Sequence, residues 1–232
     1  MAILAEPSST LGDRQAVFAQ LKERLHEVVA RAPQRRSLPT AIPGLDHLLG
    51  GGFPCGSVVA LEGSGLSAGR WGVVASLLAQ ATRRGLAAVI DDGALYPPAL
   101  AQAGVCLDRL LIVPSQTALR IARAADILLR SRICRIVVMP VAALRAAVWA
   151  RLAGLAHRMD ALLVVVSAQA TQELAIVTGL RLRCILERAI VRGARGVWCR
   201  FEGYDLRAEL HKHKRSAPGA HARLRAFASE AC

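Results

Sequence analysis

A glycine-rich stretch at residues 62–71, EGSGLSAGRW, has the residue types and spacing to bind a phosphate. The apolar run before it predicts a strand, and the segment after it predicts a helix. A strand, a glycine-rich turn and a helix N-terminus favour phosphate binding, because backbone N–H groups can turn inward around the anion. The candidate residues of this nucleotide loop are Gly63, Gly65, Gly69, Arg70 and Trp71.

The loop departs from the pattern G-x-x-x-x-G-K-[ST] at its two chemical positions. Arg70 stands in place of the lysine, and Trp71 stands in place of the hydroxyl residue that binds Mg²⁺. A guanidinium can still bind phosphate, whereas an indole offers only a donor N–H and cannot ligate a metal. Counted from Gly63, the loop is also one residue too long. Two interpretations stay open: a turn that binds no ligand, and a loop that holds a nucleotide without hydrolysing it.

Composition points to one folded domain with an acidic partner. The chain has 232 residues, of which 53% are hydrophobic and only 4% aromatic, which suits one core built from Ala, Leu and Val. The formal net charge is +13, so we expect the partner to be nucleic acid or an acidic protein surface. Membrane lipid is the weaker alternative.

Cysteine usage and hydropathy predict a cytoplasmic protein that does not enter the membrane. The six cysteines form no C-x-x-C pair, which is typical of free thiols in a reducing compartment. The N-terminus lacks a signal-peptide pattern, and no apolar run reaches the ~18 residues that span a bilayer. The six histidines show no metal-ligand spacing, so no metal site is expected.

Strand and helix signals alternate along most of the chain. Strands are predicted at residues 57–61, 87–90, 110–113, 134–139 and 161–167. Helices are predicted between them, at residues 71–84, 97–103, 118–130 and 144–159. This alternation predicts an α/β fold with a mostly parallel sheet flanked by helices. Three later segments, at residues 182–191, 196–203 and 206–213, predict an antiparallel C-terminal extension.

The same reading divides the chain into three parts. Residues 1–37 are predicted to hold an amphipathic helix, at 10–31, and a proline-containing linker. Residues 38–218 form the predicted core domain. Residues 219–232 are small, polar and basic, and are predicted to be a mobile tail.

Several segments, in order, resemble the core of bacterial RecA. Residues 38–56, LPTAIPGLDHLLGGGFPCG, resemble its approach to the first core strand, and residues 135–144, RIVVMPVAAL, are similar to its Walker B strand. Residues 164–169, VVVSAQ, resemble the strand that ends in the nucleotide-sensing Gln of that family. The resemblance extends over residues 38–218 and implies a RecA-like sheet of the P-loop NTPase type.

Within this resemblance the catalytic positions are replaced. The Walker B aspartate falls at Met139, and the glutamate that activates water falls at Gly93. Loss of a general base alone costs roughly 10²–10⁴ in rate, and loss of the metal clamp costs more. We therefore expect no ATPase activity, no catalytic residue and no required cofactor, with static ATP binding left open.

This combination resembles the ImuA-type proteins of a damage-induced mutagenesis cassette, which are related to RecA and SulA. The resemblance implies a non-catalytic accessory role in SOS-induced translesion synthesis. The implied partners are RecA, an inactive Y-family polymerase homologue and an error-prone replicative-type polymerase. Residues 212–218, KHKRSAP, resemble the segment with which one RecA protomer reaches its neighbour, so Lys212 and Lys214 are candidate RecA contacts. A simple basic tail is the equal alternative.

A second basic cluster is a candidate for DNA binding. Its members are Arg192, Arg195, Arg200, Arg207 and Arg215, and Trp198 lies among them in the sequence. Arginines interleaved with an aromatic residue suit single-stranded nucleic acid. Alternation along strands would instead place some of them on opposite faces, as an ordinary solvated surface. Two functions therefore remain as alternatives to the accessory role: a DNA-binding module and an ATP-dependent recombinase paralogue.

Overall fold

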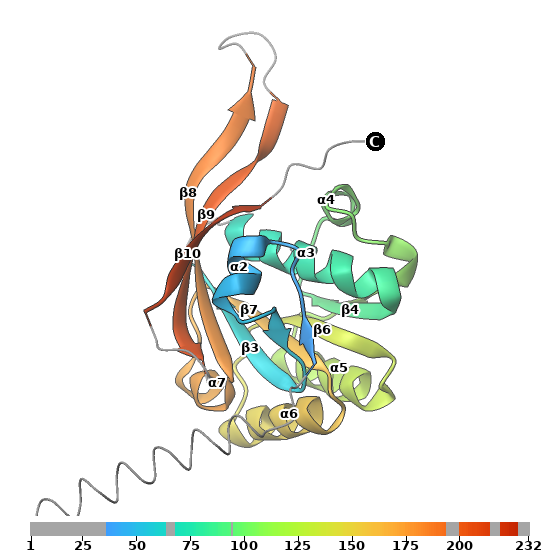
Figure 1. The fold of residues 1–232 in the computed structure, drawn as a ribbon. Helices are drawn as coiled ribbons and strands as arrows, with labels where there is room; N and C mark the ends of the chain where they lie inside the picture. Colours follow the sequence, from blue (N-terminus) through green and yellow to red (C-terminus); the bar gives the residue numbers. More distant parts are fainter. Residues whose placement is uncertain (1–35, 64–67, 94, 194–199, 214–218, 227–232) are drawn as a thin grey trace, which may run out of the picture. The chain divides into compact units, whose positions relative to one another are not determined.

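The computed structural model describes residues 36–63, 68–93, 95–193, 200–213 and 219–226. The predicted helix at residues 10–31 lies outside these ranges, as do Gly65, Arg195, Lys214 and Arg215. In the described part, eight strands form one sheet in the order β10-β9-β8-β3-β7-β6-β4-β5 (Figure 1). Their bounds are β3 (Ser57–Glu62), β4 (Leu86–Asp91), β5 (Leu110–Pro114), β6 (Cys134–Pro140), β7 (Leu162–Ser167), β8 (Leu180–Arg192), β9 (Arg200–His213) and β10 (His221–Ala226).

Strand direction divides the sheet into a parallel body and an antiparallel end. Neighbouring strands from β8 through β3, β7, β6 and β4 to β5 run parallel, whereas β9 runs antiparallel to both β8 and β10. The predicted α/β class, with a mostly parallel sheet and an antiparallel C-terminal part, is confirmed. The β8–β9 hairpin projects beyond the body of the sheet (Figure 1). We call the part of this hairpin beyond its pairing with β10, residues 190–192 and 200–203, the arm.

Helices cover both faces of the parallel body. One face packs against α2 (Pro43–Leu48), α3 (Ala68–Arg84) and α4 (Pro97–Gln102), with the short 3-10 helix η1 (Leu107–Arg109) following α4. The other face packs against α5 (Ala118–Ser131), α6 (Ala146–Arg158) and α7 (Gln172–Val177). Two apolar cores result, one on each side of the sheet. The central strands are buried on both faces, which explains their continuous Val-, Ile- and Leu-rich runs.

The lead-in to β3, residues 38–56, is folded. Strand β1 (Ser37–Leu38) at its start and strand β2 (Phe53–Pro54) near its end pair antiparallel. Within the lead-in, the backbone N–H and the hydroxyl of Thr40 both donate to Asp46 Oδ1 at 2.8 Å. Gly52 has φ +120°, and a Cβ there would lie 2.5 Å from the carbonyl oxygen of Leu38. The lead-in therefore depends on this glycine and on the Thr40–Asp46 contact.

The C-terminal segment differs from the prediction in two places. The strands predicted at residues 196–203 and 206–213 are not separate, since Arg200–His213 is continuous as β9. Gly203, the last residue of the strand predicted at 196–203, pairs with Ile190 at an irregular part of the β8–β9 register. The predicted tail at 219–232 contains β10, in which Leu224 is buried. The short, arginine-containing sequence of β10 gives little strand signal by itself, and the segment is extended because it pairs with β9.

Asp126 joins α5 to α6, and this pair predicts a pH dependence. Its carboxylate lies 2.8 Å from Arg151 Nε on α6 and 2.7 Å from Arg130 Nε one turn along α5. The hydrogen bond from Arg151, with a smaller effect of Arg130, lowers the pKa of Asp126. A lowered folded-state pKa contributes stability above the unfolded-state pKa, and that stability is lost as pH falls through the folded-state value.

Asp126→Asn is therefore expected to lower the Tm modestly at neutral pH, and this decrease should shrink only as the pH falls below about 4, the ordinary aspartate pKa. Thermal unfolding across this pH range checks the prediction. Equal decreases in Tm at both ends of the range would contradict it.

Candidate functional site

The carboxyl ends of β3, β7 and β6 meet at one edge of the sheet. Glu62 at the end of β3 is in register with Ser167, and Val166 is in register with Pro140. Ligands of open α/β sheets bind outside this edge. The loop after β3, the end of β6 at Met139 and the turn after β4 at Gly93 all belong to it. The structure thus brings the predicted nucleotide-loop and Walker B positions to the same edge.

Both described ends of the glycine-rich loop are held by the fold. The N–H of Gly63 donates to the carbonyl of Ala168 at 3.2 Å, which continues the β3–β7 pairing into the loop. At the other end Gly69 lies buried in the first turn of α3. A Cβ at Gly69 would lie 3.1 Å from Leu206 Cδ2 and 3.5 Å from Cys184 Cβ. Close approach of α3 to β8 and β9 therefore accounts for Gly69 without a phosphate.

Arg70 is the third residue of α3 and is the residue here that could hold an anion. Its Nε is buried and has no hydrogen-bond partner among the described residues. Burial raises the pKa of the neighbouring Cys184 thiol to about 12, and the charge of Arg70 acts against this rise. A cation in the first turn also opposes the positive end of the helix dipole. An anion bound to Arg70 and the first N–H groups of α3 would give Arg70 Nε a partner and would offset the positive charge at the start of the helix.

The positions that would supply hydrolysis are used by the fold in other ways. Trp71 is half-buried and packs against the core beneath α3. Met139 is fully buried in the opposite core. Gly93 is exposed with φ +103°, a conformation that disfavours a glutamate at this position. Among the described residues no group of His, Cys, Asp and Glu could hold a metal ion.

A buried ion pair at the base of the loop was missed by the sequence reasoning. The Glu62 carboxylate accepts hydrogen bonds from Arg181 Nε at 2.7 Å and from Arg181 Nη2 at 3.2 Å. The Glu62 side chain is only 5% exposed and that of Arg181 is 25% exposed. Ser167, in register with Glu62, is also buried, and its hydroxyl has no partner among the described residues. The available signal was a glutamate ending an apolar strand directly before the loop.

Lys212, a candidate RecA contact, binds within its own chain. Its Nζ donates to the carbonyl oxygens of Ala175 at 2.9 Å and Ile176 at 3.4 Å, in the last turn of α7. A cation at this end of a helix is favourable, because the last carbonyls lack partners and carry the negative end of the dipole. Lys212 therefore caps α7 and ties it to β9.

One face of the antiparallel end is strongly charged. The opposite face of β8, β9 and β10 carries the apolar residues that pack beneath α2 and α3. The register aligns three rows across the strands on the charged side: Arg183, Glu209 and His221; Ile185, Arg207 and Arg223; Arg188, Asp205 and Arg225. We call this surface the basic face and define it by Arg183, Glu187, Arg188, Asp205, Arg207, Glu209, Arg223 and Arg225.

Ion pairs on the basic face connect the three strands. Asp205 lies 2.7 Å from Arg188 Nη2 and 3.5 Å from Arg225 Nε. Glu187 lies between Arg207 and Arg223, with separations of 3.6 and 3.5 Å from their Nε atoms. Each of these two carboxylates thus serves two arginines on different strands.

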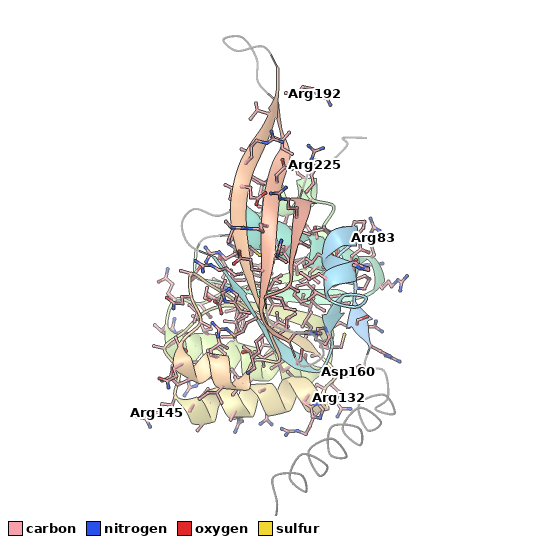
Figure 2. All side chains as sticks on the ribbon, turned by 60° about the vertical axis from the view of Figure 1, so that its left-hand side comes forward. Arg83, Arg132, Arg145, Asp160, Arg192 and Arg225 are labelled. Atoms are coloured by element: carbon pink, nitrogen blue, oxygen red, sulfur yellow. The ribbon has the colours of Figure 1, made fainter. Side chains whose placement is uncertain are left out.

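Of the predicted DNA-binding arginines, Arg207 lies on the basic face. Arg192 lies exposed at the outer end of β8 and is in register with Arg200, whose side chain the structure does not describe. Figure 2 shows Arg192 farther out along the hairpin than Arg225. The prediction missed Arg188, Arg223 and Arg225. The alternation in HARLRA, with Leu224 buried between two exposed arginines, was the signal for the last two.

Within the described residues no helix has both the length and the apolar character to cross a bilayer.

The comparison with known families matches the parallel body of the fold. No curated protein matches the sequence. Residues 46–172, more than half of the chain, match the family model of the MT3502 N-terminal domain. The match runs from α2 to the first residue of α7, so it includes the nucleotide loop and ends before β8. The chain therefore belongs to the MT3502 N-terminal domain family.

Proposed function

We propose that this chain is a non-catalytic RecA-like accessory protein in DNA-damage tolerance. It would act as a scaffold or modulator of RecA and of error-prone polymerase partners in SOS-induced translesion mutagenesis, in the cytoplasm. The ordered sequence resemblance to RecA and to ImuA-type proteins motivates this proposal. The fold supports it, because two segments that carry the resemblance, residues 135–144 and 164–169, include parts of β6 and β7, whose carboxyl ends lie with that of β3 at one edge of the parallel sheet.

The single observation that supports a non-catalytic function is the place of the three replaced catalytic positions in the fold. Met139 is enclosed by one core, Trp71 packs against the other, and Gly93 has a glycine-favouring φ. A metal clamp needs oxygen ligands, and a general base needs a titratable side chain near the attacking water. None of these three residues supplies either, so binding is the activity that remains.

The proposed partners are RecA, an inactive Y-family polymerase homologue and an error-prone replicative-type polymerase. Lys212 bears on the proposed RecA contact, because its amine already binds the carbonyls of α7. A RecA interface at this segment would have to form around that contact or replace it. Pull-downs with purified RecA and with each polymerase component test the partner assignments directly.

We expect the purified protein to release no phosphate from ATP, with or without single-stranded DNA, and to show no Mg²⁺ dependence in any nucleotide binding. The reason is that no group of three or more His, Cys, Asp and Glu residues in the described part of the chain could hold a metal ion. Titration with fluorescent ATP, in the presence and absence of Mg²⁺, and a phosphate-release assay measure the two properties. RecA in the same assays is the positive control. Tight, Mg²⁺-dependent binding would contradict the proposal and favour an ATP-controlled recombinase paralogue.

A DNA-binding module is the second candidate, and the basic face favours it. Five arginines lie on one uninterrupted sheet surface of a chain whose formal net charge is +13. This function is compatible with the accessory role, since a scaffold at a damaged template can bind both DNA and protein.

A further inference from the structure

We infer that the basic face binds the phosphate backbone of single-stranded nucleic acid. This inference deepens the proposed function, and it rests on that function only for its biological setting. It assigns a ligand class to β8–β10, a surface that lies outside the nucleotide loop and outside the stretch matched by the family model.

The charges of the basic face leave a positive surplus. Five guanidinium groups face three carboxylates, so the surface carries a net charge of +2 before any histidine is protonated. The arginine side chains are exposed, at 71% for Arg188, 83% for Arg223 and 68% for Arg225. Exposed ion pairs of this kind contribute little to stability. Because these ion pairs are exposed and weak, an external anion can bind the arginines that outnumber the carboxylates.

Contact geometry leaves donors of the arginines accessible. The contacts of Arg207, Arg223 and Arg225 are made by Nε at separations of 3.4 to 3.6 Å, longer than a good hydrogen bond. Their terminal amino groups are not needed for these contacts. Planar pairs of amino groups match the oxygens of a phosphate, and such bidentate pairs are among the stronger hydrogen bonds. The carboxylates hold the arginine side chains across the strands while the guanidinium edges stay accessible.

Spacing on the sheet fits an extended chain of phosphates. Arg223 and Arg225 are two residues apart on one side of β10, which separates them by about 7 Å along the strand. Arg188 and Arg225 flank β9 and lie about 10 Å apart across it. Successive phosphates of an extended nucleic-acid strand repeat at a distance similar to the first of these. A backbone laid along β10 would therefore meet one guanidinium after another.

The shape of the face favours a single strand over a duplex. Three strands make a surface about 10 Å between outer strand axes, room for one sugar-phosphate backbone. The major groove of a duplex admits an α-helix or a two-stranded β-ribbon, whereas the basic face is a wider surface of three paired strands. Its exposed side chains are charged or aliphatic, so the contacts would be with phosphate and sequence-independent. An acidic polypeptide would lack the regular repeat that matches the rows.

The test is fluorescence anisotropy with labelled oligo-dT and the isolated full-length chain. The double variant Arg223→Gln/Arg225→Gln is expected to bind roughly ten-fold more weakly and to lower the slope of log K against log salt concentration by about 1.4, or ~0.7 for each lost phosphate contact. The matched control, Arg83→Gln/Arg84→Gln, removes the same charge from the exposed end of α3 and is expected to change affinity by less than about two-fold. Thermal unfolding checks that both variants fold.

A second variant separates ligand binding from internal ion pairing. Asp205→Asn removes a carboxylate between Arg188 and Arg225, so it is expected to tighten oligo-dT binding several-fold by raising the surplus charge. This variant also keeps the test valid if the double arginine variant does not fold.

Three results would overturn the inference: unchanged binding by the arginine variant, equal binding of duplex and single strands, or displacement of oligo-dT by poly-glutamate at equal charge. The oligo-dT binding assay contains neither RecA nor a nucleoside triphosphate. A negative result here therefore leaves the accessory-protein proposal standing, and a failed RecA pull-down leaves this inference standing.

Discussion

Met139→Asp is expected to lower the free energy of unfolding by about 4 kcal/mol or more, instead of creating a metal site. Met139 is 0% exposed and lies in register with Val165, among apolar side chains of the core beneath α5 and α6. A carboxylate placed there loses its water and has no cation to pair with. Because small domains are stable by only about 5–15 kcal/mol, the variant would be unfolded in a substantial fraction or recovered as an aggregate.

Urea denaturation measures this effect through the midpoint and slope of the transition. Met139→Leu keeps the volume and polarity, so it is the matched control, with an expected loss below about 1.5 kcal/mol. A stable Met139→Asp variant that Mg²⁺ stabilises further would show that the edge of the sheet still forms a metal site. That result would remove the main support for a non-catalytic protein.

Loss of the Glu62–Arg181 ion pair is expected to have the second largest effect. Arg181→Met leaves a carboxylate that is 5% exposed without its partner, and breaking a buried pair in this way costs about 3–5 kcal/mol. Glu62→Leu should cost less, because Arg181 is 25% exposed and can still reach water. The double replacement Glu62→Leu/Arg181→Met removes both charges, and its stability should be close to that of the native protein.

The three variants and the native chain form a double-mutant cycle, which urea denaturation can measure. A positive coupling free energy, with Arg181→Met the least stable of the four, is the expected pattern. If Arg181→Met changes stability by less than about 0.5 kcal/mol, the pair is an ordinary surface contact and Glu62 is better solvated than its burial indicates.

The parallel body could be predicted from sequence because its signals are local. Each central strand is a short apolar run, and α5 and α6 have clear helical periodicity. The candidates Arg70 and Trp71 came from the glycine-rich loop, and Met139 and Gly93 came from the RecA resemblance. The antiparallel end was less accessible, since β9 continues through Gly203 and β10 is short and rich in arginine.

The contacts that define the site are non-local, which is why the sequence did not reveal them. Glu62 and Arg181 are 119 residues apart, and Lys212 is 37 residues from Ala175. Periodicity assigns a face to each residue but not its partner on another strand. The basic face depends on the register of three strands, so its arginines could be grouped only after β8, β9 and β10 had been aligned.

β8 is attached to the parallel body along only part of its length. Only Leu180–Arg183 of this strand pairs with β3, whereas the pairing with β9 continues out to Arg192. In terms of amide hydrogen exchange, the arm can open while the parallel body stays protected, because the two share few hydrogen bonds. The Glu62–Arg181 pair and the Lys212 cap lie at the junction. Ligand binding to the basic face is therefore expected to increase amide protection in β8–β10 before it does so in the parallel body.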